Sequence, residues 1–132
     1  MTFASCDPFH SLVVSNASKE DKRIQIVLPP EAYNAFPLRD SLLFESQDKK
    51  DNIPTKTVKR PVNQDSLTKS YSFVLPSNQN AILESGFGAR PILNQKIIID
   101  NTDTIIVKPK AKRVKKKPKL SLGGEYKVTI TD

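Results

Sequence analysis

Residues 108–119 read Lys-Pro-Lys-Ala-Lys-Arg-Val-Lys-Lys-Lys-Pro-Lys and concentrate the positive charge of the chain. Eight of the 21 Lys and Arg residues lie in this run, which contains no acid. The rest of the chain has 13 basic and 14 acidic residues, so without the run the formal charge falls from +7 to −1. Cations at this density bind phosphates and other polyanions. The residues expected to make such contacts are Lys108, Lys110, Lys112, Arg113, Lys115, Lys116, Lys117 and Lys119.

The basic run predicts two compatible functions. Clusters of lysine and arginine of this kind are bound by nuclear import receptors, which indicates a nuclear protein. The same cations could follow a phosphate backbone: if all eight contacted duplex DNA, the salt slope of the affinity would be about −7. Such contacts carry no sequence preference, and the run has no aromatic residue on which a base could stack. A solvated loop that only aids solubility is a third interpretation.

Residue types that support catalysis or metal binding are scarce. His10 and Cys6 are the only histidine and cysteine, so neither a zinc site nor a cysteine–histidine nucleophile is predicted. No Gly-x-Ser-x-Gly turn supports a serine nucleophile, and Gly86-Phe-Gly88 lacks the third glycine of a dinucleotide-binding loop. We therefore expect a protein without enzymatic activity, cofactor or bound metal.

The same composition indicates the compartment. One cysteine allows no internal disulfide, which fits a reducing environment. The first 30 residues lack the basic start and apolar run of a signal peptide. The longest apolar stretches, 97–99 and 105–107, are three residues each, far too short to span a membrane. We expect a soluble intracellular protein without a membrane contact.

Short alternating patterns define the elements that must position the basic run. Alternation of apolar and polar residues predicts strands at 23–28, 41–45, 70–75 and 125–131. Residues 55–59 alternate and carry lysines, as exposed edge strands do. The β-branched runs 96–100 and 104–108, separated by turn formers, predict a hairpin. One helical turn is expected at 31–36, and the ten prolines argue against long helices.

Six or seven short strands with turn signals between them predict an all-β fold, a small barrel or sandwich dimerisation domain with an extended basic arm. We expect residues 1–107 to form the β-rich dimerisation domain, 108–119 the basic arm, and 120–132 a C-terminal extension that forms a strand. Because only 37% of the residues are hydrophobic, the core should be thin and completed by a partner.

The predicted strands also supply the apolar residues expected at the partner interface, although several of them must be internal core. These residues are Ile24, Ile26, Leu28, Phe73, Leu75, Ile97, Ile99, Ile105 and Val107. Lys56, Lys59 and Arg60 could extend the basic surface, but the acids around them favour a solvated segment. The patterns do not determine the strand order.

Several short motifs, taken in order, resemble the smaller subunit of the TFIIF-like, triple-barrel heterodimer of RNA polymerase I. Phe3-Ala-Ser-Cys-Asp-Pro-Phe9 resembles the element that opens this family, and Ile24–Pro29 and Phe73–Ser77 are similar to its proline-ended strands. The basic run leading into Leu120-Ser-Leu-Gly-Gly124 resembles the segment that follows its strand pair. The family's longer lysine-rich tail and its bulky aromatic near the first strand have no counterpart here. Triple-barrel subunits of polymerase III and TFIIIC share these features.

The resemblance implies a non-enzymatic nuclear, and more narrowly nucleolar, subunit of a transcription complex. Its β domain would pair with a larger β-barrel subunit, and its basic segment would run over the RNA polymerase core near nucleic acid. The residues alone leave a second hypothesis open. In that hypothesis the chain is a free-standing DNA- or RNA-binding protein, viral or chromatin-associated, that contacts the phosphate backbone through the arm.

Overall fold

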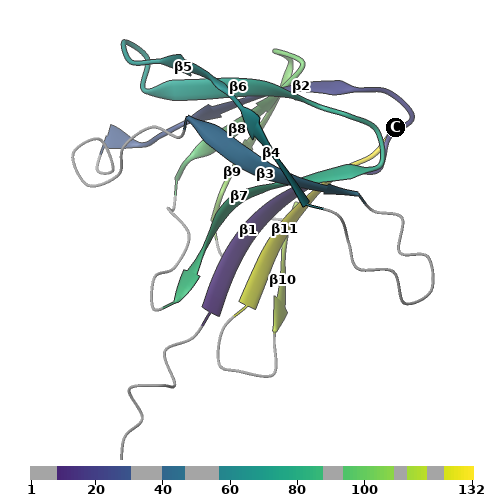
Figure 1. Cartoon of the computed structure of the whole chain (residues 1–132). Helices are drawn as coiled ribbons and strands as arrows, with labels where there is room; N and C mark the ends of the chain where they lie inside the picture. The colour runs from purple at the N-terminus through teal and green to yellow at the C-terminus, as the bar shows by residue number, and fades with distance from the viewer. Residues whose placement is uncertain (1–8, 31–39, 47–56, 88–93, 109–112, 119–123) are drawn as a thin grey trace, which may run out of the picture.

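The computed structural model describes residues 9–30, 40–46, 57–87, 94–108, 113–118 and 124–132, which form strands and turns (Figure 1). The eleven strands in these ranges are β1 (Phe9–Asn16), β2 (Lys22–Val27), β3 (Ser41–Ser46), β4 (Thr57–Pro61), β5 (Asn63–Asp65), β6 (Ser70–Leu75), β7 (Gln79–Phe87), β8 (Lys96–Ile99), β9 (Asp103–Ile106), β10 (Val114–Pro118) and β11 (Gly124–Ile130).

The strands form two sheets. Sheet A has the order β10-β11-β1-β7-β3-β4, and sheet B the order β5-β6-β2-β8-β9. β1 and β11 run parallel, and the other neighbouring strands are antiparallel. The all-β prediction is confirmed. Of the two predicted architectures the structure shows the sandwich-like one, because neither sheet closes into a barrel within the described ranges.

Most of the strands predicted from alternation are present with small shifts of their ends. The predicted strands at 23–28, 41–45, 70–75 and 125–131 correspond to β2, β3, β6 and β11, and the predicted hairpin corresponds to β8 and β9. The predicted edge strand at 55–59 is β4, an edge of sheet A. β1, β5, β7 and β10 were not predicted, and the helical turn expected at 31–36 lies outside the described residues.

The core forms where the inner faces of the two sheets meet. Ile24 and Ile26 alternate with exposed or half-buried neighbours on β2 and are fully buried, as period-two side-chain alternation requires. Phe44 of sheet A meets Phe73 of sheet B edge to face, with ring centroids 5.6 Å apart. Each such aromatic pair adds about 0.5–1.5 kcal/mol beyond the area it buries.

The chain changes sheets at both sides of the sandwich. On one side β4 leads into β5 through a single residue, Val62, whose N–H donates to the carbonyl of Asp40. On the other side β9 is the edge of sheet B and β10 is the edge of sheet A. The segment between β9 and β10, which carries half of the basic residues of the run, therefore connects two sheet edges.

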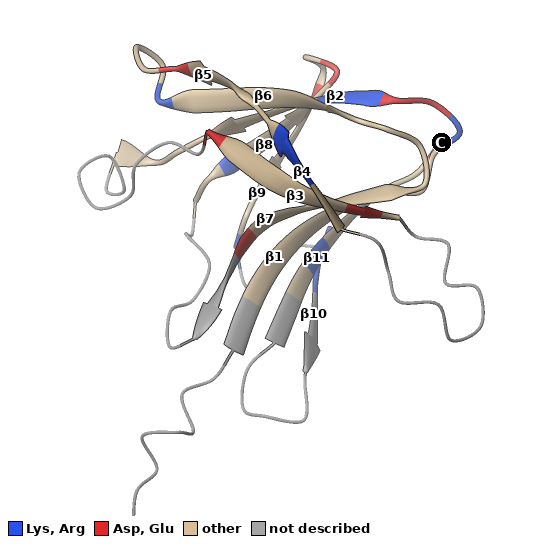
Figure 2. Ribbon diagram, in the orientation of Figure 1, with Lys and Arg blue, Asp and Glu red and all other residues tan. Residues whose placement is uncertain are grey.

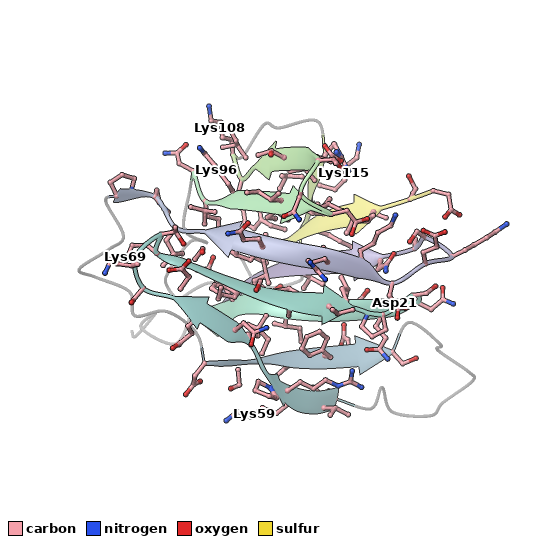
Figure 3. The ribbon with its side chains drawn as sticks, turned by 90° about the horizontal axis from the view of Figure 1, so that it is seen from above. Asp21, Lys59, Lys69, Lys96, Lys108 and Lys115 are labelled. Carbon is pink, nitrogen blue, oxygen red and sulfur yellow. The ribbon has the colours of Figure 1, made fainter. Side chains whose placement is uncertain are left out.

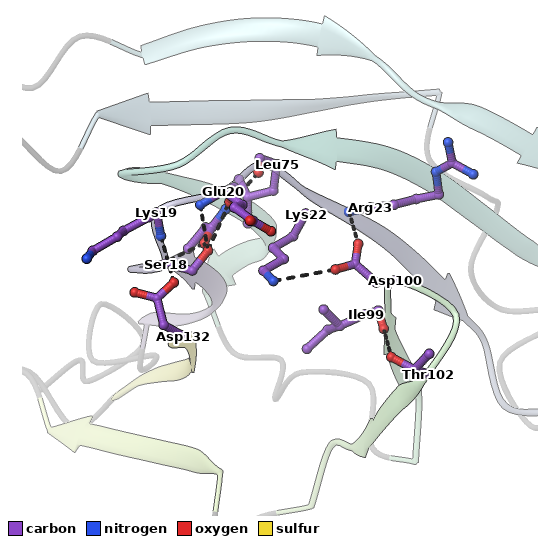
Figure 4. Close-up of polar contacts among 11 residues, drawn as sticks. Ser18, Lys19, Glu20, Lys22, Arg23, Leu75, Ile99, Asp100, Thr102 and Asp132 are labelled. Atoms are coloured by element: carbon purple, nitrogen blue, oxygen red, sulfur yellow. Dashed lines mark hydrogen bonds and ion pairs between the residues drawn. The ribbon is translucent and has the colours of Figure 1, made fainter.

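A buried polar network joins the sheets at the β1–β2 connection. The fully buried Asn16 donates through Nδ2 to the carbonyls of Glu20 and Leu75, each at 2.9 Å, and its Oδ1 accepts from the N–H of Ser18. The N–H of Lys19 donates to the carboxylate of Asp132 near the end of β11 (Figure 4). These bonds satisfy polar groups that would be costly to bury alone.

The β8–β9 turn is tied to the start of β2. Asp100 and Asn101 adopt left-handed φ angles of 50° and 59°, a conformation that Asp and Asn tolerate better than most residues. The N–H of Asp100 donates to the carbonyl of Arg23, and its Oδ1 accepts from the Arg23 N–H at 2.9 Å (Figure 4). Lys22 adds an ion pair at 3.5 Å. The turn therefore fixes the hairpin against its neighbour.

The expected division at residue 108 differs from the structure. Val114–Pro118, within the predicted basic arm, form β10 and pair antiparallel with β11, and Val114 packs into the core opposite Val128. The cause is a long-range pairing that a run of lysines does not reveal. The described part of the run therefore ends as an edge strand of sheet A rather than an extended arm.

All nine residues expected at a partner interface lie in the core of the chain itself. Ile24, Ile26, Leu28, Phe73, Leu75, Ile97, Ile99, Ile105 and Val107 are each at most 6% exposed. They face the opposite sheet, so a partner could reach them only if the sandwich opened. Alternation marks the apolar face of a strand, but it does not tell whether that face meets the same chain or another.

Candidate polyanion-binding surface

Basic side chains gather on the side of the sandwich where β9 and β10 form the two edges. We name this surface the basic flank and define it by Lys96, Lys108, Arg113, Lys115 and Lys127. The first four side chains are exposed and Lys127 is half-buried. They come from β8, β10, β11 and the residues that border β9 and β10. Because β9 and β10 are the sheet edges on this side, Lys96, Lys108 and Lys115 lie on the same side of the molecule (Figure 3).

Two lysines of the basic flank stand directly opposite each other. Lys115 of β10 pairs with Lys127 of β11 in the antiparallel register. Figure 2 colours the basic residues of the described strands blue. Opposed residues share a face of the sheet, with Cβ atoms about 4.5–5.5 Å apart. Like charges at this separation repel and destabilise the pair. A bound anion would relieve that repulsion.

A second pair of lysines lies at the end of the β8–β9 hairpin. Lys96 pairs with Ile106, and Lys108 follows Ile106 by two residues, so both lysines occupy the outer face of sheet B. Figure 3 shows Lys96 and Lys108 close together, on the far side of the molecule from Lys59. Within the described residues neither takes part in an ion pair. These two cations are available to an external anion.

Arg113 differs from the lysines of the basic flank because it is paired with an acid. Its guanidinium forms a charge-assisted hydrogen bond with Asp103 Oδ2, with about half of each side chain exposed. The contact joins the start of β10 to β9 and thereby the edges of the two sheets. Because Asp103 already neutralises it, Arg113 would contribute less to polyanion binding than the lysines around it.

The structure describes part of the predicted basic set. Lys108, Arg113 and Lys115 lie on the basic flank, and Lys116 and Lys117 occupy β10 opposite Tyr126 and Glu125. Lys110, Lys112 and Lys119 lie outside the described residues. Sequence reasoning missed two members of the flank, Lys96 and Lys127. Lys127 could have been found, since it alternates with the buried Tyr126 and Val128 and must face outward.

The other predicted extension of the basic surface lies elsewhere. Lys59 and Arg60 belong to β4, the opposite edge of sheet A, and Lys56 lies outside the described residues. The Arg60 guanidinium lies 5.5 Å from the ring centroid of Phe44, where a cation–π contact favours it. Arg60 therefore covers the core at this edge and does not enlarge the basic flank.

Within the described ranges no group of three or more His, Cys, Asp or Glu residues is placed to hold a metal ion. His10 lies in β1, and Cys6 lies outside those ranges. The described residues also include no helix long and apolar enough to cross a membrane.

Comparison with known proteins gives no relative from which a function could be transferred. No protein-family model, no curated protein and no solved structure matches this chain.

Proposed function

We propose that this chain is a non-enzymatic nuclear binding protein whose basic flank contacts the phosphate backbone of nucleic acid. The observation that carries the proposal is the opposed pair Lys115 and Lys127, two cations kept on one face of adjacent strands without an acid between them. Lys96 and Lys108 add two exposed cations on the same side of the molecule. A surface of this kind binds through charge and reads no sequence.

The aromatic side chains favour a duplex over a single strand as the ligand. The structure describes the burial of four aromatic side chains, Phe44, Tyr71, Phe73 and Tyr126; each is at most 6% exposed, so these four rings are used in the core. Proteins that bind single strands without sequence preference use exposed aromatic rings as stacking platforms. Phosphates held at regular intervals along a duplex suit lysines that are fixed on the rigid edges of two sheets.

The test is the salt dependence of binding to a duplex of arbitrary sequence. The double variant Lys115→Gln/Lys127→Gln should weaken binding and reduce the steepness of the logarithmic salt slope by about 1.8, from roughly 0.9 per lost phosphate contact. The matched control Lys19→Gln/Lys59→Gln removes the same charge away from the basic flank and should leave the slope unchanged. Equal slopes for both double variants would refute the proposal.

A second candidate function is a subunit of a nuclear transcription complex that pairs with a larger β-barrel protein and contacts the RNA polymerase core. The observation that favours it is the presence of edge strands, β4 and β10 in sheet A and β5 and β9 in sheet B. Edge strands offer unpaired backbone groups to another chain. Affinity purification of the tagged chain from nuclear and nucleolar extracts tests this candidate: polymerase subunits should be recovered after nuclease treatment, whereas a free-standing protein would lose its associated material.

A further inference from the structure

The outer faces of the two sheets continue the basic flank with different chemistry. On sheet A the strand register aligns one residue from each of the six strands in a row across the outer face. From β10 to β4 these residues are Lys115, Lys127, Val13, Ile82, Leu43 and Lys59. Beyond Lys127 the row is therefore apolar for three strands, and its next cation stands at the opposite edge of the sheet. Apolar side chains offer a phosphate no hydrogen bond.

The outer face of sheet B is polar where it adjoins the flank. Lys96 pairs with Val27 of β2, and two residues along that strand Gln25 pairs with Ile98, which in turn pairs with Thr104. Since directly opposed residues share a face, Gln25 and Thr104 lie on the same face as Lys96. Amide and hydroxyl side chains contact phosphates alongside lysine and arginine. On this sheet the flank continues into groups that can hold a phosphate backbone.

Arg23 lies at the far end of this polar stretch. It stands two residues before Gln25 on β2 and pairs with Val74 of β6. Val74 is 53% exposed and Arg23 is exposed, so this part of the outer face is open to solvent. Within the described residues the Arg23 guanidinium forms no ion pair. A cation outside the basic flank therefore faces the same solvent as Lys96.

The acids beside Arg23 are bound by other donors. Asp100 accepts the backbone N–H of Arg23 at 2.9 Å and forms an ion pair with Lys22 at 3.5 Å. Asp21 Oδ1 accepts the N–H of Ser77 at 3.1 Å. Figure 4 shows the Arg23 guanidinium pointing away from the Asp100 carboxylate. The planar guanidinium can therefore present its donors to an external phosphate, which it binds in a bidentate manner.

The spacing of the cations on sheet B suits a single phosphate backbone. Four residues along β2 separate Arg23 from Val27, the partner of Lys96, so the Cα atoms of Arg23 and Lys96 are about 14 Å apart. Lys108 lies one strand and two residues beyond Lys96, at about 8 Å. The line from Lys108 to Arg23 is about 22 Å long, a length over which one strand of a duplex carries about six phosphates. Each cation can therefore contact a different phosphate of the same strand.

We infer that the backbone of a bound duplex leaves the basic flank across the outer face of sheet B, from Lys108 and Lys96 past Gln25 to Arg23, which binds a phosphate at the far end. The inference rests on the proposed function. It adds to that function the direction in which the nucleic acid lies and a contact residue outside the basic flank. It also excludes the outer face of sheet A around Ile82 and Leu43 from the contact.

The first test compares the salt dependence of duplex binding among single variants. Arg23→Gln should lower the affinity about eightfold at 0.1 M salt and reduce the steepness of the salt slope by about 0.9, the loss of one phosphate contact. Arg23→Lys should keep the slope but bind more weakly than wild type, because lysine lacks the bidentate fork. Lys59→Gln is the matched control, since it removes one exposed charge from the outer face of sheet A, and it should change neither quantity.

The second test needs no substitution and follows the wild-type chain by NMR during titration with the duplex. The side-chain amide signals of Gln25 and the backbone amide of Val74 should shift, whereas the amides of Ile82 and Leu43 should not. An unchanged slope for Arg23→Gln, or shifts at Ile82 and Leu43 without shifts at Gln25, would overturn this inference and leave the proposed function standing. Absence of duplex binding by wild type at low salt would refute both.

Discussion

β9 and β10 form the two edges on one side of the sandwich, but their chemistry is opposite. β9 is anchored by Ile105 and Val107, and its exposed residues Thr104 and Ile106 carry no charge. In β10, Val114 packs in the core, and three consecutive lysines follow it in the sequence. The comparison teaches that the charge of an edge, more than its position in the sheet, determines which partner it can accept.

The largest expected effect on the free energy of unfolding concerns the buried residue that anchors β9 in the core. Ile105→Ala should lower the free energy of unfolding by about 2–5 kcal/mol, because it leaves a cavity between the two sheets. Ile106→Ala removes the same atoms from an exposed position and should cost less than about 1 kcal/mol. Urea denaturation measures both. Similar losses for the two variants would contradict the assigned faces of β9.

A smaller loss is expected for the anchor of β10. Val114→Ala should reduce the free energy of unfolding by about 2 kcal/mol, from the buried methyl groups and the cavity that they leave. Because Val114 pins the start of β10, hydrogen exchange at β10 and the facing part of β11 should accelerate more than exchange at β8. If hydrogen exchange accelerated equally in both sheets, Val114 would not stabilise β10 in particular.

The opposed lysines allow a substitution that should stabilise the fold while weakening ligand binding. Lys115→Glu places an acid opposite Lys127 and should raise the free energy of unfolding by about 0.2–1 kcal/mol, with the gain shrinking at high salt. Affinity for a nucleic acid duplex should fall at the same time. Lys59→Glu is the control, since Lys59 pairs with the apolar Leu43 and gains no opposite charge. A loss of stability on Lys115→Glu would contradict the repulsion between the two lysines.

The smallest effect is expected where the two edges touch. Arg113→Ala removes the ion pair with Asp103, and since both side chains are about half exposed the cost should lie below about 1 kcal/mol. Thermal unfolding at low and high salt measures it. A cost of several kcal/mol would indicate that this contact holds the two edges together more strongly than an exposed pair can.

Alternation in the sequence predicted those strands that have one buried and one solvent-facing side. Ile24 and Ile26 of β2 are of this kind. The β8–β9 hairpin was predicted from its two β-branched runs and the turn formers between them. β1 was not predicted because Ser11, Val13 and Ser15 are buried on one face while Leu12 and Val14 are buried on the other. A strand covered on both sides shows no polar period, and small polar residues conceal it further.

The candidate site was predicted less completely than the fold. The lysine run correctly predicted which segment is basic, but it did not predict the strand β10. Val114 is a single apolar residue among lysines, and the pairing of β10 with β11 is a long-range contact that local patterns do not contain. The residues predicted at a partner interface show a second limit of prediction from sequence patterns. Ile97 and Ile105 were correctly read as the apolar face of their strands, but the surface against which they pack belongs to the same chain. Local patterns contain no information on that choice.

The central claim, that the basic flank binds nucleic acid phosphates, is tested most directly by an amide chemical-shift titration of the full chain with a duplex of arbitrary sequence. Binding should shift the amide signals around Lys96, Lys108, Lys115 and Lys127, and high salt should abolish the shifts. Shifts centred on Lys59 and the β4–β5 side, or no shifts at low salt, would contradict it.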